Sequence, residues 1–273
     1  MTPSCWIDGQ PAEALPLTDR GLHYGDGLFE TLPVRDGRIP LLDAHLERLA
    51  EGCRRLGIAA PAAQLLQQEL CVAAQHQSRA VLKLMLTRGS GGRGYRPPEA
   101  ATPVRILLRY PWPDHPETWQ REGIHLRVCS TRLGRNPALA GLKHLNRLEQ
   151  VLARAEWGGS SSVQEGLMLD EGGLVVEGTM TNVFAAPEEG RLLTPDLDRC
   201  GVAGVMRRHL IECAKAEGVR VEQRHMSLAE LLDHRELFVC NSIVGVWPVL
   251  RVSEQDCVPG TMTRRAQRWA AQA

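Results

Sequence analysis

The sequence predicts a mixed α/β (α+β) protein with two domains, the second of them richer in strands. Its 273 residues exceed the roughly 100–200 residues that a single domain usually takes. Helical and strand-like patterns alternate up to residue 110, whereas strand-like runs dominate from residue 123. Between them, PWPDHPETWQ carries three prolines and little periodicity, so we expect an interdomain linker over residues 111–122.

The predicted first domain, residues 1–110, combines short strands with amphipathic helices. Apolar residues recur at helical spacing from Leu42 to Leu56, which predicts a helix ending near Gly57. The runs AVLKLMLT and VRILLRY predict strands on either side of a glycine-rich loop. We expect its strands at 4–8, 30–35, 80–87 and 104–110, and its helices at 42–57 and 61–76.

The predicted second domain, residues 123–273, contains a dense series of strands in EGLMLD, GLVVEG, NVFAA and RLLT. A helix is expected from Val202, with Met206 and Leu210 on the same apolar face, and Ser227 with Glu230 predicts a capping box. We expect further strands at 124–130, 236–240 and 243–250, and helices at 144–157 and at the C-terminus. This half therefore predicts a barrel or sheet flanked by helices.

The composition favours a small polar ligand. The chain has 32 basic and 32 acidic residues, which gives no reason to expect a nucleic acid as partner. No apolar run approaches the roughly 20 residues of a membrane helix, and the first ten residues do not resemble a signal peptide, so we expect a cytoplasmic protein. The eight cysteines form no CxxC pair or metal-ligand cluster, so we expect reduced thiols and no metal site.

Lysines are rare in this sequence, and Lys143 is the best placed of them for chemistry. Only three of the 32 basic residues are lysines. Lys83 lies within a predicted strand and Lys215 on the outer part of a predicted helix, whereas Lys143 follows the small-residue turn ALAG at a strand-to-helix junction. A nucleophilic lysine needs a protected pocket near other charges, and a junction can provide one. The alternative is a solvated lysine at a helix start.

A carboxylate and an anion-binding turn complete a candidate site. Glu177 ends the apolar strand GLVV before the small, polar turn GTMTN, although it could be a surface charge. The segment CGVAGVMRR opens a helix with small residues, so the amides of Val202 and Ala203 could bind an anion, aided by Ser242 and Arg48. A lysine, a carboxylate and a phosphate cradle are together the requirements of a pyridoxal 5'-phosphate (PLP) site.

Several motifs of this chain resemble those of the fold-type IV PLP enzymes. They are HYGDGLFET, HLERL, Lys143, EGTMTNVF, GVAGVMRR and a final strand ending in WPV. That family includes branched-chain aminotransferases, D-amino acid aminotransferases and aminodeoxychorismate lyases. The strings TRGSGGRGY and LGRNPALAGLKHLNRLEQV look like those of the lyases. The resemblance covers nearly the entire chain and implies a smaller N-terminal α/β sandwich, a larger C-terminal pseudo-barrel and a homodimer.

The resemblance also implies roles for individual residues. Lys143 would hold PLP as a Schiff base, and Glu177 would partner the pyridine nitrogen. Arg48, Val202, Ala203 and Ser242 would hold the phosphate. Where related aminotransferases often carry tyrosines, this chain has Leu148 and Phe29, so the contact to the phenolic oxygen is left to Asn146 or a water.

The lyase resemblance implies conversion of 4-amino-4-deoxychorismate to 4-aminobenzoate and pyruvate in folate biosynthesis. The substrate carries two carboxylates, for which Arg93 is our first choice and Arg88 the second, with Tyr24 and Thr31 lining the pocket. The alternatives are a D-amino acid or branched-chain aminotransferase of the same fold, or a non-catalytic PLP carrier. The sequence leaves open whether a partner synthase delivers the unstable substrate through transient contact.

Overall fold

The computed structural model describes residues 4–159 and 162–273, which form two compact units. Unit 1 contains the chain up to Asp114 together with Leu142–Asn146, and unit 2 contains His115–Gly141 and Arg147–Ala273. The boundary after Asp114 lies inside the segment predicted as a linker. The second domain was predicted to hold all residues from 123 onward, but the five residues around Lys143 belong to unit 1.

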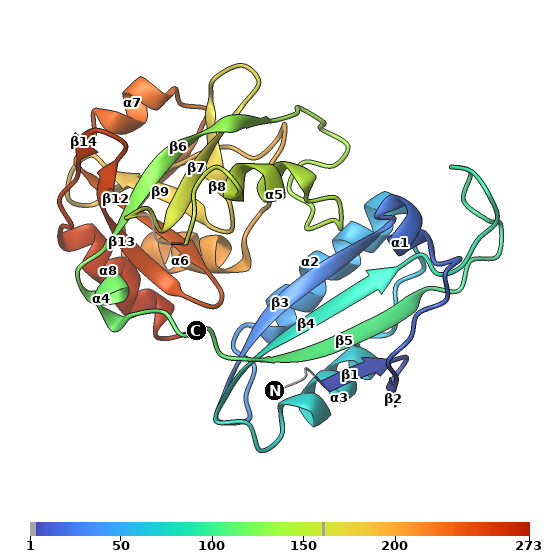
Figure 1. Ribbon diagram of the computed structural model, residues 1–273. Coiled ribbons are helices and arrows are strands. Elements are labelled where there is room, and N and C mark those ends of the chain that lie inside the picture. Colours follow the sequence, from blue (N-terminus) through green and yellow to red (C-terminus); the bar gives the residue numbers. More distant parts are fainter. Residues whose placement is uncertain (1–3, 160–161) are drawn as a thin grey trace. The chain divides into compact units, whose positions relative to one another are not determined.

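Unit 1 is a five-stranded antiparallel sheet in the order β2-β1-β5-β4-β3, with helices on one face (Figure 1). Alternation of side chains along β3 and β4 places Leu32 and Leu82 toward the helices and Thr31 and Lys83 on the opposite face. Its strands are β1 (Ser4–Ile7), β2 (Gln10–Pro11), β3 (Gly27–Arg35), β4 (Arg79–Thr87) and β5 (Val104–Pro111), and its helices are α1 (Arg20–Tyr24), α2 (Leu42–Leu56) and α3 (Ala63–Ala74).

Helix α2 follows its predicted apolar stripe closely. Leu46, Leu49 and Cys53 are buried on the face toward the sheet. The helix ends where Gly57 adopts a left-handed conformation with φ 61°, which glycine reaches without a Cβ clash. The predicted helix at 42–57 is therefore confirmed.

The segment around Lys143 forms a short antiparallel addition to the edge strand β3. The Phe29 amide donates to the Lys143 carbonyl at 2.9 Å, and the Leu145 amide donates to the Gly27 carbonyl at 3.0 Å. An edge strand presents unpaired backbone groups, and this segment satisfies some of them on β3. The sequence predicted a helix from residue 144, but α5 begins only at Leu148, because residues 142–146 are held extended on β3.

Unit 2 is a nine-stranded mixed sheet that curls, with helices around it (Figure 1). Its main order is β11-β10-β9-β12-β13-β6-β7-β8, and β14 pairs with β13. The strands are β6 (Ile124–Leu133), β7 (Glu165–Asp170), β8 (Val175–Gly178), β9 (Asn182–Ala186), β10 (Arg191–Thr194), β11 (Arg220–Gln223), β12 (Glu236–Asn241), β13 (Gly245–Val252) and β14 (Gln255–Asp256), and the helices are α4 (Glu117–Arg121), α5 (Leu148–Arg154), α6 (Val205–Ala216), α7 (Leu228–Leu232) and α8 (Thr261–Ala270).

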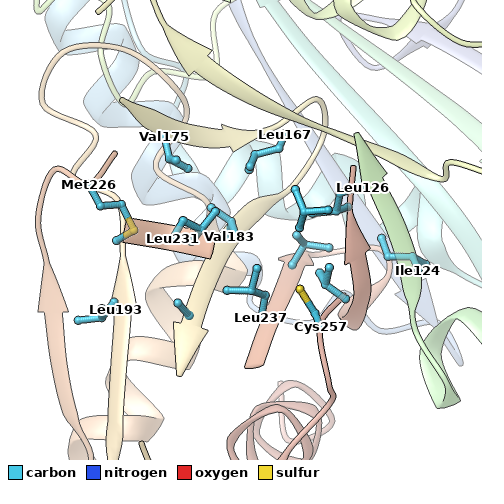
Figure 2. Packing of buried hydrophobic residues seen from close by; sticks show 14 of the residues in the cluster. Ile124, Leu126, Leu167, Val175, Val183, Leu193, Met226, Leu231, Leu237 and Cys257 are labelled. Carbon is cyan, nitrogen blue, oxygen red and sulfur yellow. The ribbon is translucent and has the colours of Figure 1, made fainter. Parts of the chain in front are cut away.

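The core of unit 2 lies within this curl. Side chains from seven of its strands meet there, among them Ile124, Leu167, Val183 and Leu237 (Figure 2). Alternate positions point the other way, so that Phe184 stacks with its cross-strand partner Phe238 at 5.0 Å between ring centroids. Burial of both faces explains why these strands are continuous apolar runs.

Helix boundaries in unit 2 refine the predictions. Ser227 and Glu230 form the predicted capping box at the start of α7. Helix α6 begins at Val205 and not at Val202, because Gly201 takes φ 85° and Gly204 is the extended N-cap residue. Across the described residues, every helix is too short or too polar to span a bilayer.

Candidate functional site

Lys143 lies on the face of the unit 1 sheet that is opposite α2 and α3. Its backbone is fixed by the pairing with Phe29, and its Nζ lies 4.3 Å from the centroid of the Phe29 ring. Two residues earlier, Gly141 belongs to unit 2 and pairs with Gly201 and Ala203 there. The chain is thus tied down on both sides of Leu142, which restricts where Lys143 can point.

A buried ion pair and a histidine lie on the other side of β3. Glu30 and His45 are each 1% exposed, and the Arg48 guanidinium donates to both Glu30 oxygens, from Nε at 2.8 Å and from Nη2 at 2.5 Å. Burial raises the pKa of Glu30, but the Arg48 charge and the bonds from His45 and Arg48 outweigh it and lower that pKa to about 2. This bidentate pair fixes the plane of the Arg48 guanidinium.

His45 completes that cluster as a neutral ring. Its Nδ1 lies 2.7 Å from Glu30 Oε2, and a carboxylate accepts only, so Nδ1 carries the proton. Burial lowers the pKa of His45, with further lowering from Arg48 and Lys143, and the opposing attraction of Glu30 does not reverse it. The sequence analysis named Arg48 but missed Glu30 and His45. A glutamate on the helix-facing side of a strand was the signal that could have found them.

The glycine-rich loop of unit 1 is held by α1. Arg20 donates to the carbonyls of Gly94 and Tyr95, and the Tyr24 hydroxyl accepts from the Gly94 amide at 3.1 Å. Arg93 directly precedes these anchored residues and has an exposed side chain. Tyr24, which we expected to line the pocket, therefore positions the loop that presents Arg93.

Arg88 has a structural role in unit 1. It is buried and donates to Asp26 Oδ2 at 2.8 Å and to the carbonyls of Gly57 and Leu56 at 2.7 and 2.8 Å. These bonds direct the guanidinium toward the end of α2, so the geometry argues against the prediction that Arg88 binds a substrate carboxylate. Burial of Asp26 opposes ionisation, but the bonds from Arg88 and Arg20 lower its pKa overall.

In unit 2, Glu177 lies at the end of β8 beside the turn that precedes α6. Its side chain is almost completely buried, and Oε2 accepts from the Val202 amide at 2.9 Å. Asn182 also contacts this turn, donating to the Val202 carbonyl at 2.9 Å. A surface position for Glu177, the alternative in the sequence analysis, is excluded by this burial.

The amides of Val202 and Ala203, the predicted phosphate donors, both have acceptors within the protein in this structure. The Val202 amide donates to Glu177, and the Ala203 amide donates to the Gly141 carbonyl at 3.0 Å. The prediction assumed a helix from Val202, but the first turn of α6 starts three residues later. The first amides of a helix have no acceptor within the helix, so Val205 and Met206 are the better anion donors here.

The turn after Glu177 is held by a buried carboxylate that the sequence analysis missed. Glu165, on β7, is fully buried and accepts from the amides of Gly166, Thr179 and Met180 and from the hydroxyls of Thr179 and Thr181. Glu165 therefore fixes the Gly178–Thr181 turn. Its only sequence signal is an acidic residue at the start of an apolar strand.

Ser242 lies in a neighbouring turn, between β12 and β13. Asn241 accepts from the amides of Ile243 and Val244, both at 2.9 Å, and donates to the Met180 carbonyl at 3.1 Å. The turns at 178–181, 201–204 and 241–244 are thus linked by side-chain hydrogen bonds within unit 2. Asn146, in unit 1, donates to the Gly25 carbonyl at 3.0 Å.

Comparisons with known proteins identify relatives that match almost the whole chain. The chain is 39% identical over 266 residues to an aminodeoxychorismate lyase of Vibrio harveyi, covering 96% of this chain and 97% of that protein. It superposes on the crystal structure of 4-amino-4-deoxychorismate lyase from Pseudomonas aeruginosa with a TM-score of 0.94 and 50% identity, covering 98% of each chain. It is also 31% identical to a putative branched-chain-amino-acid aminotransferase of Methanocaldococcus jannaschii, over 90% of this chain and 85% of that protein.

The family assignment follows from the extent of the match and from the fold. A family model described as amino-transferase class IV matches residues 27–252, which span β3, the Lys143 segment, Glu177, α6 and β13. The predicted two-part α/β architecture with a curled, strand-rich second part is confirmed. This chain belongs to the amino-transferase class IV family.

Proposed function

We propose that this protein converts 4-amino-4-deoxychorismate to 4-aminobenzoate and pyruvate, with PLP as its cofactor, as a step in folate biosynthesis. The observation that carries the proposal is the similarity to lyases of this name over almost the full length of each chain. Relatives named as aminotransferases are less similar to this chain over its length, at 31% identity over 90% of it and 27% over 93% of it, and one that is 34% identical matches only 52% of it. The lyase is therefore favoured over the aminotransferase alternative.

The donor set fits PLP. A phosphate ester needs cations and open amides, which Arg48 and the first turn of α6 can supply, with Ser242 adding a hydroxyl. A pyridine nitrogen needs a buried carboxylate to stay protonated, and Glu177 is 5% exposed. An aldehyde needs an amine to form a Schiff base. Lys143 is the lysine that lies within the sequence motifs, and its backbone is fixed by pairing with Phe29.

We assign the proton transfers to Lys143 and the electrostatics to Glu177. When bound, PLP supplies an electron sink for the carbon that carries the substrate amine. Lys143 Nζ removes the proton from that carbon, and Glu177 keeps a proton on the pyridine nitrogen. The adjacent C–O bond then breaks, the enolpyruvyl group leaves as pyruvate, and the ring becomes aromatic. Substrate and products have the same atoms, so no second substrate is needed.

Recognition of one of the two substrate carboxylates is proposed for Arg93, with Thr31 lining the pocket. Arg93 has an exposed guanidinium on a loop whose backbone is held by Arg20 and Tyr24. Asn146 remains a candidate for the phenolic oxygen of PLP, since its amide nitrogen carries two hydrogens and the bond to the Gly25 carbonyl uses one of them.

We also propose a cytoplasmic homodimer. The outer face of α5 carries Leu148, Val151 and Leu152, which are 76%, 59% and 60% exposed, and adjacent exposed aliphatic side chains are typical of an interface. All eight cysteines are free thiols, which suits a reducing compartment. Light scattering of the purified protein should give a mass near twice 30.2 kDa.

The test is a coupled assay that generates aminodeoxychorismate in situ and detects 4-aminobenzoate. We expect product from the wild type and at least a 1,000-fold loss in Lys143→Ala, because covalent and proton-transfer roles are lost together. Lys215→Ala, on the exposed surface of α6, should retain full activity. Sustained pyruvate release from D-alanine and 2-oxoglutarate, with no 4-aminobenzoate formed, would instead favour the aminotransferase.

A further inference from the structure

A second lysine shares the Phe29 ring with Lys143. Lys83 Nζ lies 5.3 Å from the Phe29 ring centroid, and Lys143 Nζ lies 4.3 Å from the same point. Two of the three lysines of the chain therefore converge on one aromatic ring. Neither the sequence motifs nor the roles proposed above account for Lys83.

The strand register explains why the two ammonium groups meet there. Thr31 is the direct cross-strand partner of Lys83, and Phe29 is the next residue of β3 on the same face. On the other side of β3, Phe29 pairs with Lys143 through the backbone. Lys143, Phe29, Thr31 and Lys83 thus form a row across three neighbouring strands, on the sheet face opposite α2 and α3.

The surroundings of Lys83 within unit 1 are apolar. Its neighbours along β4 on this face are Val81 and Met85, and its partner on β5 is Leu108. Among the described residues, Lys83 forms no ion pair with a carboxylate, and its ammonium group contacts the Phe29 ring. Glu30, the nearest acidic residue along β3, points to the opposite face.

An ammonium group at a half-buried strand position is unfavourable unless an anion or water compensates its charge. Lys83 is the central residue of β4, with four residues of the strand on either side of it. Its side chain therefore lacks the solvent exposure that a position at a strand end would give. A contact with an aromatic face contributes only about 0.5–2 kcal/mol. The position therefore suits a residue that is retained to bind an anionic ligand.

We infer that Lys83 binds the ring carboxylate of the substrate. The inference rests on the proposed function, in which Lys143 removes the proton from the carbon that carries the substrate amine. The amine and the ring carboxylate lie at opposite ends of a six-membered ring, so the anionic end must be bound at a distance from Lys143. Lys83 is a cation in the same row of side chains, with Thr31 as a neighbouring hydrogen-bond donor.

The test compares Lys83→Met and Lys83→Arg with Lys215→Met in the PLP-loaded protein. Loss of a charge-assisted bond should raise KM for aminodeoxychorismate about 10- to 100-fold in Lys83→Met, with a smaller change in kcat. Lys83→Arg keeps the charge and should recover most of the affinity. Lys215 is exposed on α6, so its variant should match the wild type within twofold.

A binding measurement separates carboxylate recognition from a structural role. The product 4-aminobenzoate keeps the ring carboxylate, whereas 4-aminobenzamide has the same shape without the charge. Calorimetric titration should show that the wild type prefers 4-aminobenzoate and that Lys83→Met loses most of this preference. Lys83→Gln provides a second neutral variant if Lys83→Met loses the visible absorbance of the cofactor.

Two results would overturn the inference. One is a KM within twofold of wild type in a Lys83→Met or Lys83→Gln protein that retains its cofactor. The other is an equal preference for 4-aminobenzoate over 4-aminobenzamide with and without Lys83, or no preference in the wild type. If the wild type forms no 4-aminobenzoate from aminodeoxychorismate, the proposed function fails, and the titration still decides whether Lys83 binds a carboxylate.

Discussion

Glu30 in unit 1 and Glu165 in unit 2 are both buried carboxylates beside residues of the candidate site, but they are stabilised in different ways. Glu30 is held by the guanidinium of Arg48 and by the imidazole of His45. Glu165 is held by three backbone amides and two threonine hydroxyls, and no cation pairs with it in the part of the chain that the structure describes. The first arrangement orients a charged side chain, whereas the second orients a stretch of backbone.

The two arrangements indicate different roles for Glu30 and Glu165. A bidentate pair fixes the plane of the Arg48 guanidinium, which suits a phosphate-binding cation. Amides converging on Glu165 fix the Gly178–Thr181 turn, which directly follows Glu177 and contacts Asn241. We therefore expect loss of Glu30 to act mainly through charge, and loss of Glu165 mainly through local backbone order.

The largest effect is expected for Glu30→Gln. The substitution keeps the shape but withdraws the negative charge from Arg48, whose side chain is only 13% exposed. Breaking a buried ion pair in this way typically costs about 3–5 kcal/mol in the free energy of unfolding. Urea denaturation followed by circular dichroism measures it.

The matched control is Glu51→Gln, on the exposed side of α2, the helix that also carries Arg48. Glu51 also forms a bidentate contact with an arginine, Arg54, but in solvent. Exposed pairs contribute little, so its denaturation midpoint should be unchanged. Equal effects of the two substitutions would contradict the view that burial gives the Glu30 pair its importance.

A smaller effect is expected for Glu165→Gln. An amide nitrogen cannot accept a hydrogen bond, so the donors that face one carboxylate oxygen lose their acceptor, at a cost of about 1.5–3 kcal/mol. Because the turn follows Glu177, we also expect weaker PLP binding, measured by titrating apoprotein with the cofactor. Glu188→Gln, at an exposed position, should alter neither quantity. Unchanged PLP affinity in a destabilised Glu165→Gln protein would confine Glu165 to a structural role.

The same contrast explains how much the sequence could predict. Helix α2 followed from local periodicity, because residues three and four apart share a helix face. Arg48 was expected as a phosphate-binding cation from the resemblance of its motif, HLERL. The partnership of Arg48 with Glu30 did not follow from either, since it joins a helix to a strand 18 residues earlier. Glu165 and the turn that it holds are 14 to 16 residues apart and are brought together only by the pairing of β7 with β8.

Helix starts were predicted less well than helix faces, with a direct consequence for the site. The spacing of Met206 and Leu210 gave the buried face of α6 correctly. The prediction started this helix at Val202 and so included three residues of the preceding turn. The predicted phosphate donors therefore lie in the turn and not in the first turn of the helix. Glycines at 201 and 204 fit both a helix start and the turn preceding one, and only the φ of 85° at Gly201 distinguishes them.

The smallest effect concerns pH and tests the charge state of the Glu30 cluster. The pKa of His45 is lowered in the folded protein, so the unfolded chain binds its proton first as the pH falls below about 6.5. Stability should therefore decrease from pH 7 to pH 5.5, by at most about 1.4 kcal/mol per pH unit from this group. Glu30 does not contribute in this range, because its folded pKa is about 2 and its unfolded pKa is near 4.5.

His45→Gln isolates this contribution, because glutamine can donate to Glu30 but does not titrate in this range. The free energy of unfolding of the variant should fall less steeply with pH than that of the wild type, since the other eight histidines are common to both. If the wild type instead gained stability relative to the variant as the pH fell, His45 would be taking up a proton beside Glu30. Glu30 would then be balanced by two cations, and its contrast with the uncharged partners of Glu165 would be greater than the structure indicates.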